Sequence, residues 1–276
     1  MSKDRIENRS EELEARPYVI SIAGLDPSAG AGLLSDLKCF EAQRVYGFGV
    51  CTALTVQTDT EFLKNDWLET EQVIAQLKPL VEKFPIQAVK IGLIKNLETL
   101  STVCEFLNSF DPKIKIVLDP IIKATAGYNF HDWNGDPDVF KNVLKRLYLI
   151  TPNYLEMLEL KGGTRQVQGD SDTEVSTEAV DQLCRTWSED CAVLLKGGHH
   201  PLTPGTDYLF QQKEQLAFKS GSAFVAPKHG SGCVLSSAIT AQLALGNSIP
   251  ESCLLGKQYI EKFLNSNTSL LGYHNL

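Results

Sequence analysis

Several features that would mark particular classes of protein are missing from this sequence of 276 residues. Its seven cysteines are odd in number and include no Cys-x-x-Cys pair, so they do not read as a disulfide framework. Most stand inside apolar runs, which is typical of reduced thiols that pack in the core of a cytoplasmic protein. We find no signal peptide and no apolar run long enough to span a bilayer, so we expect a cytoplasmic protein that does not bind membranes.

Positive charge is also scarce. Lys and Arg number 26 against 34 Asp and Glu, which leaves a net charge of −8. Nucleic-acid-binding proteins ordinarily carry a basic surface, so the composition argues against a nucleic-acid partner. An acidic protein that binds phosphates must do so through local geometry and not through a long-range positive field. The glycine-rich stretches do not fit Gly-x-Gly-x-x-Gly, so a dinucleotide fingerprint is not supported.

Short apolar runs alternate with helical patterns along nearly the whole chain. Strands are predicted at 18–23, 48–56, 88–91, 114–118, 148–151 and 191–195, and hairpin strands at 207–210, 215–219 and 222–225. Pro79 predicts a kink or a break in the helix that contains Val73 to Phe84. We therefore expect one α/β domain over residues 17–276, with a mostly parallel central sheet, helices on both faces and a small antiparallel edge extension. Residues 1–16 are expected to form a flexible tail.

The stretch from Gly230 to Cys233 precedes a helical run of apolar and small residues, 234–245. The first N–H groups of a helix have no intrahelical partner, and the helix dipole adds partial positive charge there. Glycines let the backbone approach a bulky anion closely. The stretch indicates an anion cradle, formed by Gly230, Ser231, Gly232 and Cys233, with a thiol at its rim. The alternative is a glycine turn that merely starts a core helix and carries a buried cysteine.

A second glycine-rich loop, 24–32, follows the first predicted strand and opens a helix. Ligands of α/β proteins gather at the carboxyl ends of strands, so this loop is a candidate binding site. Asp36 stands on the first turn of the helix, where an acid commonly interacts with the positive helix end. Gln57 ends the second strand. Its amide can pair with an amino group beside a ring nitrogen, as in an aminopyrimidine, or can tether a loop.

Further polar side chains follow later strands. Asp119 ends a buried strand, where a carboxylate needs a partner such as a metal ion or a capped turn. Asn153 and Glu156 have the spacing of a helix capping box, although the Glu156 carboxylate can also hold Mg²⁺ through water. Lys196 precedes two glycines and either faces solvent or reaches a phosphate. The polar stretch 124–138 fits an active-site flap or a long connection.

In their order along the chain, these motifs resemble those of one known family. They are Gly24-Leu25-Asp26-Pro27-Ser28-Ala29-Gly30-Ala31-Gly32 with Asp36-Leu37-Lys38, Thr52-Ala53-Leu54 with Gln57, Lys90-Ile91-Gly92, Val117-Leu118-Asp119-Pro120, Thr151-Pro152-Asn153 with Glu156, Lys196-Gly197-Gly198-His199 and His229-Gly230-Ser231-Gly232-Cys233. The set is similar to the hydroxymethylpyrimidine/phosphomethylpyrimidine kinases of thiamin biosynthesis, a branch of the ribokinase superfamily. Each motif alone is weak, but the ordered set is highly specific.

The resemblance implies a ribokinase-like fold, ATP with Mg²⁺, a small pyrimidine substrate and a homodimer. It places the pyrimidine-binding glutamine on Gln57 and a substrate-side acid on Asp36, and it has Gly24 line the pocket. Leu93 stands where the family often has a methionine. The metal- and phosphate-side groups fall on Asp119, Glu156, Asn153 and Lys196. Of these, we assign Asp119 and Glu156 to the metal, and Asn153 and Lys196 to the nucleotide.

Cys233 stands where most of the superfamily has an aspartate that acts as the base. We expect the helix terminus to lower its pKa from about 8.5 towards neutrality. Many relatives have Lys-Ser-Gly where this chain has Thr125-Ala126-Gly127, so whether Lys123 or Thr125 covers the phosphates stays open. Ala29 replaces a usual glycine.

Three other functions compete with this hypothesis. Pyridoxal or pyridoxine kinase is a close alternative, because that activity occurs in the same superfamily. A sugar kinase is disfavoured because position 233 is not Asp. A non-catalytic sensor of a nucleotide or vitamin precursor is disfavoured because the cradle, Asp119, Glu156 and Lys196 are all retained.

Overall fold

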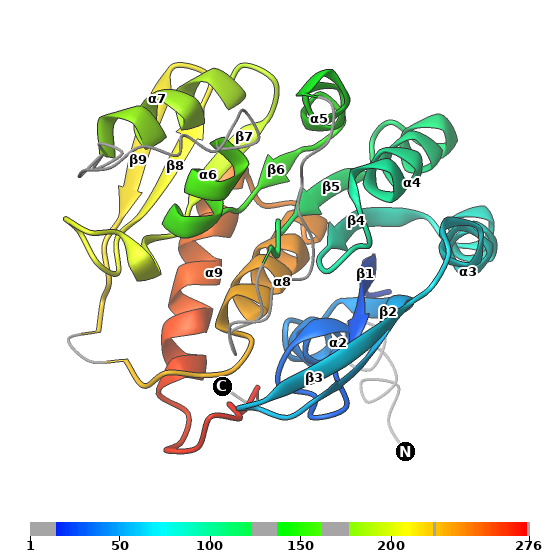
Figure 1. Ribbon diagram of the computed structural model, residues 1–276, viewed down its shortest axis with the longest axis horizontal. Helices are drawn as coiled ribbons and strands as arrows, with labels where there is room; N and C mark the ends of the chain where they lie inside the picture. The colour runs from blue at the N-terminus through cyan, green and yellow to red at the C-terminus, as the bar shows by residue number, and fades with distance from the viewer. Residues whose placement is uncertain (1–14, 123–136, 162–176, 223–224, 275–276) are drawn as a thin grey trace, which may run out of the picture.

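The computed structural model describes residues 15–122, 137–161, 177–222 and 225–274. Within these ranges, nine strands form a single sheet in the order β3-β2-β1-β4-β5-β6-β7-β8-β9 (Figure 1). The strands are β1 (Tyr18–Leu25), β2 (Tyr46–Gln57), β3 (Phe62–Trp67), β4 (Ile86–Ile91), β5 (Lys115–Leu118), β6 (Leu149–Ile150), β7 (Ala192–Leu195), β8 (Asp207–Gln211) and β9 (Glu214–Phe218).

The centre of the sheet, from β2 to β7, is parallel, and both edges are antiparallel. Each of the six predicted parallel strands is present. The β8–β9 hairpin confirms the antiparallel extension late in the chain, whereas neither Ser222 nor Val225 lies in a strand and residues 223–224 are outside the described ranges. Strand β3, antiparallel to β2, was not predicted, because its sequence Phe-Leu-Lys-Asn-Asp-Trp lacks a clear alternation of apolar and polar residues.

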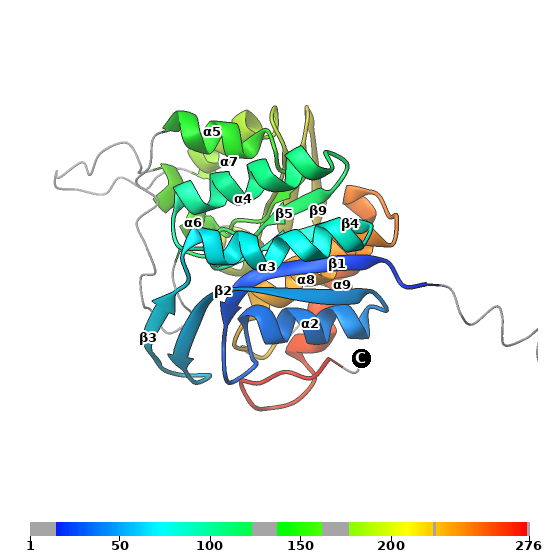
Figure 2. The same ribbon diagram turned by 90° about the vertical axis from the view of Figure 1, so that its right-hand side faces the viewer.

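Helices cover both faces of the sheet, as the sequence predicted (Figure 2). One face packs against α3 (Thr70–Lys83), α4 (Leu97–Phe110), α5 (Pro137–Leu144), α6 (Tyr154–Lys161) and α7 (Thr177–Trp187). The other packs against α2 (Gly32–Ala42), α8 (Ser231–Ala244) and α9 (Ile249–Leu264). Because both faces are covered, the central strands consist of nearly continuous apolar residues.

Helix α3 runs without interruption past Pro79, so the break that we allowed for in the sequence does not occur. A proline inside a helix removes one backbone hydrogen bond. Val73, Leu77 and Val81 are all buried on the face that packs on the sheet, and they hold both halves of the helix there.

Some predictions concern residues outside the described ranges. These are residues 1–14 of the predicted tail, and Lys123, Thr125 and nearly all of the candidate flap at 124–138. At the tail boundary, Arg16 Nη1 lies 2.7 Å from Glu41 Oε1 on α2. In the part of the chain that the structure describes, no helix is both long enough and apolar enough to cross a bilayer.

Candidate active site

The carboxyl ends of the parallel strands bring most of the predicted site residues to one edge of the sheet. Loop 24–32 follows β1, Gln57 ends β2, and Asp119 follows β5. Asn153 and Lys196 follow β6 and β7 and form an isolated parallel bridge with each other. Ligands of open α/β sheets bind at this edge.

Lys196 lies between two carboxylates. Its Nζ donates to Asp119 Oδ1 at 2.6 Å and stands 3.6 Å from Glu156 Oε2. The three side chains are 10%, 1% and 12% exposed. Burial disfavours the charge on Asp119, but the charges of Lys196 and Lys90, with hydrogen bonds from Lys196 and Ser236, together outweigh it, and the pKa of Asp119 is lowered. Burial, with a contribution from the charge of Asp119, raises the pKa of Glu156 to about 7. We call these three side chains the Lys196 cluster.

Asn153 and Glu156 form the capping box that their spacing predicts. Asn153 Oδ1 accepts from the Glu156 N–H at 2.9 Å, and Glu156 Oε2 accepts from the Asn153 N–H at 2.7 Å. The same Glu156 oxygen faces Lys196. The capping and site interpretations are therefore compatible, because the cap holds the carboxylate of Glu156 in the Lys196 cluster.

The start of α8 faces the Lys196 cluster. The first helical hydrogen bond runs from the Val234 N–H to the Gly230 carbonyl, so the preceding amides have no partner within the helix. Gly230 has φ 74°, in the left-handed region that favours glycine. A Cβ atom on Gly232 would lie 3.3 Å from Lys196 Nζ and 4.0 Å from Asp119 Oδ2. An anion at these amides would thus also meet the lysine charge.

Cys233 is 8% exposed at the rim of this cradle. Burial raises the pKa of its thiol to about 11. Lys90 and a hydrogen bond from the Gly32 backbone oppose the rise, whereas Asp119 and Asp36 add to it. The lowered pKa expected from the helix terminus is therefore wrong for the free protein, because burial and the two nearby acids outweigh the effect of the helix end.

Asp36 does not face a substrate site, and its assignment as a substrate-binding residue is wrong. It is completely buried, and Lys90 Nζ donates to its Oδ1 at 2.5 Å. Ser21 donates to Oδ2 at 2.5 Å, and Ser237 donates to Oδ1 at 2.6 Å. Both carboxylate oxygens are occupied. The carboxylate therefore connects α2 to β1, β4 and α8 beneath the cradle.

Gly24, Leu93 and Gln57 lie at the far side of the same edge. A Cβ atom on Gly24 would stand 2.9 Å from Leu93 Cδ2, so the two residues are in contact. The half-buried Gln57 donates from Nε2 to Thr55 Oγ1 at 2.9 Å, and Thr55 donates to the Leu25 carbonyl at 2.8 Å. The amide of Gln57 is thereby directed towards loop 24–32.

Asp26 and His229 are site residues to which the sequence analysis assigned no role, although both stand in its motifs. His229 Nε2 lies 2.9 Å from Asp26 Oδ2, which joins loop 24–32 to the residue before the cradle. The Asp-Pro-Ser sequence is a local signal that could have been used, because aspartate before a turn accepts backbone hydrogen bonds. The contact with His229 spans 203 positions and has no local signal.

The family model for phosphomethylpyrimidine kinase matches residues 26–275. The chain belongs to that family. It is 32% identical over 247 residues to the hydroxymethylpyrimidine/phosphomethylpyrimidine kinase of Rhizobium meliloti (strain 1021), an alignment that covers 90% of each protein.

Solved structures also resemble this chain. The phosphomethylpyrimidine kinase of Clostridium difficile 630 has a TM-score of 0.69 and 31% identity, and the match covers 89% of this chain and 98% of that one. The pyridoxal kinase of Staphylococcus aureus, in complex with pyridoxal, has a TM-score of 0.77 at 23% identity, with 95% and 94% of the chains covered. At that identity the second likeness shows the shared fold only. The ribokinase-like fold implied by the sequence is thus confirmed.

The Lys196 cluster fits the magnesium ion that the family implies. Among the described residues, no group of three or more His, Cys, Asp or Glu side chains could enclose a metal. Mg²⁺ is ordinarily bound by one or two carboxylates together with substrate phosphates and water, and not by a cage of protein ligands. Asp119 and Glu156 supply that kind of donor set.

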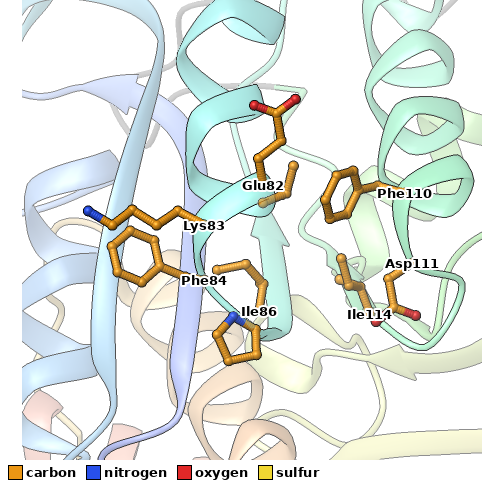
Figure 3. Close-up of a pocket in the computed structure, with 9 residues that line it drawn as sticks. Glu82, Lys83, Phe84, Ile86, Phe110, Asp111 and Ile114 are labelled. Carbon is orange, nitrogen blue, oxygen red and sulfur yellow. The ribbon is translucent and has the colours of Figure 1, made fainter.

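A separate cavity of about 260 Å³ lies at the opposite, amino edge of the sheet. Figure 3 shows its lining, which includes Glu82, Lys83 and Phe84 at the end of α3 and Phe110 at the end of α4. It contains none of the predicted site residues. Because the cavity lies at the amino ends of β4 and β5, the length of the strands separates it from the cradle.

Proposed function

We propose that this protein transfers the γ-phosphoryl group of ATP to 4-amino-5-hydroxymethyl-2-methylpyrimidine and, in a second step, to the monophosphate of that pyrimidine. One observation supports this above the others: the amides at the start of α8, which have no partner within the helix, face the Lys196 cluster, in a chain whose family match spans residues 26–275. The use of ATP is further supported by the structural neighbour from S. aureus, which was solved with ADP and with AMP-PCP.

Phosphoryl transfer passes through a loose transition state, so positioning and charge neutralisation provide most of the catalysis. The amides of residues 231–233 bind phosphoryl oxygens, and Lys196 places its charge beside them. Asp119 and Glu156 are the residues that would hold Mg²⁺ through water. When bound, that ion neutralises phosphate charge. The Lys196–Asp119 ion pair keeps both groups oriented before the nucleotide arrives.

Cys233 acts in this proposal as a neutral thiol that contacts the acceptor oxygen. A thiol with a pKa of about 11 is not a base at neutral pH. A loose transition state requires little deprotonation before transfer, and the acceptor of the second step is already an anionic phosphate. A strong base is therefore not required. The role left for the Cys233 thiol is to orient the acceptor. We expect Cys233→Ala to lower turnover by roughly 10²-fold.

Gln57, Gly24 and Leu93 form the pyrimidine side of the proposed site. The Gln57 amide offers an acceptor and two donors, which match an amino group beside a ring nitrogen. Leu93 provides an apolar wall, and Gly24 leaves room beside it.

An assay of ADP release tests the function. It compares the hydroxymethylpyrimidine, its monophosphate and pyridoxal as acceptors, each with and without Mg²⁺. We expect turnover with both pyrimidines, little with pyridoxal, and none after removal of Mg²⁺ with EDTA. Turnover with pyridoxal alone would replace the proposal with a pyridoxal kinase, and no turnover with any acceptor would favour a non-catalytic sensor.

A further inference from the structure

The Asp26–His229 pair joins the two glycine-rich segments of the site and has no role in the chemistry described above. Its side chains are 1% and 8% exposed, and the atoms Asp26 Oδ2 and His229 Nε2 are 2.9 Å apart. Asp26 belongs to the loop after β1, whereas His229 directly precedes Gly230. A buried contact of this kind fixes the position of one segment relative to the other.

The hydrogen bonds around the pair specify the state of each group. Asp26 also accepts from the backbone N–H groups of Ser28, at 2.8 Å, and Ala31, at 2.9 Å. Every neighbour donates, so Asp26 is a carboxylate and His229 must carry its proton on Nε2. His229 Nδ1 is buried and has no partner among the described residues.

The backbones of the two segments touch at this point. A Cβ atom on Gly30 would lie 2.5 Å from His229 Cδ2, and one on Gly230 would lie 2.2 Å from the Gly30 carbonyl oxygen. On its other side, the His229 N–H donates to the Leu270 carbonyl at 2.9 Å. The residue before the cradle is thus held from two directions, and loop 24–32 provides one of them.

We propose that Asp26 and His229 are positioning residues that set the distance between the acceptor and the phosphate cradle. The inference rests on the proposed function, in which loop 24–32 borders the pyrimidine and residues 231–233 bind the phosphoryl group. Neither side chain needs to touch a substrate. Misplacement by about 1 Å can lower the rate of a reaction about 10²-fold.

The positioning role determines whether the phosphoryl group is transferred to the pyrimidine or to water. In the intact site, the hydroxymethyl oxygen bonds to the γ-phosphorus, the bond to the ADP oxygen breaks, and the hydroxyl proton passes to solvent. When the acceptor is displaced from the cradle, water attacks the same phosphorus and yields inorganic phosphate and ADP. The ratio of ADP released to phosphoryl groups transferred to the pyrimidine therefore reports on positioning, whether one or both phosphorylation steps occur.

The experiment compares His229→Leu, which removes the donor, with His229→Gln, which retains one of similar reach. Leu107→Ala is the matched control, because Leu107 is fully buried on α4, on the face of the sheet away from α8. We expect His229→Leu to lower kcat by about 10²-fold and to raise the ratio of ADP to transferred phosphoryl groups well above one. His229→Gln restores most of the turnover and a ratio near one. Leu107→Ala lowers the Tm and leaves the ratio unchanged.

A second measurement does not depend on activity. Hydrogen exchange of the full-length, ligand-free protein is followed in peptides that cover 24–34 and 226–236. We expect both to exchange at least about tenfold faster in His229→Leu and not in Leu107→Ala, since loss of a contact opens the elements that it joins. If His229→Leu does not fold, Asp26→Asn takes its place.

The outcomes separate the two proposals. A wild-type protein that phosphorylates no pyrimidine contradicts the proposed function, while the exchange data still decide whether the pair holds the two segments together. An active wild type whose His229→Leu variant keeps its ratio and its exchange pattern overturns the positioning role.

Discussion

Single backbone positions determine much of the geometry of loop 24–32. Ala29 adopts φ 56°, in the left-handed region where a Cβ atom is unfavourable. Its N–H donates to the Asp26 carbonyl at 3.0 Å, so the conformation belongs to the same turn that presents Asp26 to His229. The strain is therefore maintained by contacts around it.

The first prediction concerns this position. Ala29→Gly relieves the strain, and we expect the free energy of unfolding to rise by about 1 kcal/mol. The matched control is Ala31→Gly in the same loop, where φ is −134° and glycine brings only a larger entropy in the unfolded chain. Urea unfolding measures both variants. Equal effects of the two substitutions would contradict the role of the backbone angle.

The second prediction concerns the thiol of Cys233. Only the thiolate reacts with iodoacetamide, and a pKa of about 11 leaves little thiolate at neutral pH. We expect alkylation of Cys233 in the ligand-free protein to be slow at pH 7 and to rise about tenfold per pH unit until the pKa is approached. Mass spectrometry follows the modified peptide, with the half-buried Cys51 as an internal comparison. A rate that levels off near pH 7 would show a lowered pKa instead.

At the scale of elements, α8 is a buried helix whose hydroxyl groups bind two acids. Ser236 donates to Asp119 at 3.1 Å, and Ser237 donates to Asp36 at 2.6 Å. The helix that forms the cradle is thereby attached to both the Lys196 cluster and the Asp36–Lys90 ion pair. Polar residues on its buried face serve to place its N-terminus.

The third prediction tests the ion pair. Lys90→Met leaves Asp36 buried without its cation, and we expect a loss of about 3–5 kcal/mol of stability. The double variant Asp36→Asn/Lys90→Met removes both charges and recovers a large part of that loss. Denaturant unfolding gives the three free energies. If Lys90→Met is neutral, the two residues are not paired in solution.

The fourth prediction concerns the cap of α6. Glu156→Gln keeps an acceptor for the Asn153 N–H but removes the charge, so the helix stays stable while the Mg²⁺ concentration for half-maximal activity rises about 10–100-fold. Glu251→Gln is the matched control, because Glu251 occupies the same position of the capping box of α9. Titration of activity with Mg²⁺ distinguishes them. An equal response of both variants would limit Glu156 to capping.

At the scale of the molecule, all strands in the described ranges join one sheet, and the single domain predicted for residues 17–276 stays a prediction. The cysteines in those ranges are free thiols, and the cytoplasmic location expected from the composition stays a prediction. The homodimer implied by the resemblance stays a prediction. Leu54 and Val56, two residues apart on β2, are 49% and 41% exposed and offer an apolar contact surface.

The fifth prediction is that the protein is a dimer and that this surface contributes to it. Sedimentation equilibrium should give twice the chain mass of 30.5 kDa. The variant Leu54→Lys/Val56→Glu places each new charge opposite Asp66 or Lys64 on β3, so the hairpin is retained while the apolar surface is lost. We expect this variant to be a monomer. A wild-type monomer, or a variant that stays dimeric, contradicts the prediction.

Local patterns predicted most of the fold and the edge at which the site lies. Apolar runs of strand length and helical stripes are short-range signals, and polar residues at strand ends follow from them. The family resemblance added Gln57, Gly24 and Leu93 as substrate residues, and these stay predictions. Strand β3 was missed because its residues carry no clear period. Of the kink or break predicted at Pro79, the break does not occur, because packing on the sheet outweighs one lost hydrogen bond.

Sequence alone thus determined the α/β architecture, the family and the residues that gather at the carboxyl edge of the sheet. The strands, the helices and the polar residues at strand ends follow from short-range patterns, and the family follows from the order of the motifs along the chain. Only the tertiary structure decided that Asp36 is buried with Lys90, that burial raises the pKa of Cys233, and that His229 joins Asp26. Solvation and charge at a side chain depend on whatever packs around it. In this protein those neighbours come from segments as far as 203 residues away.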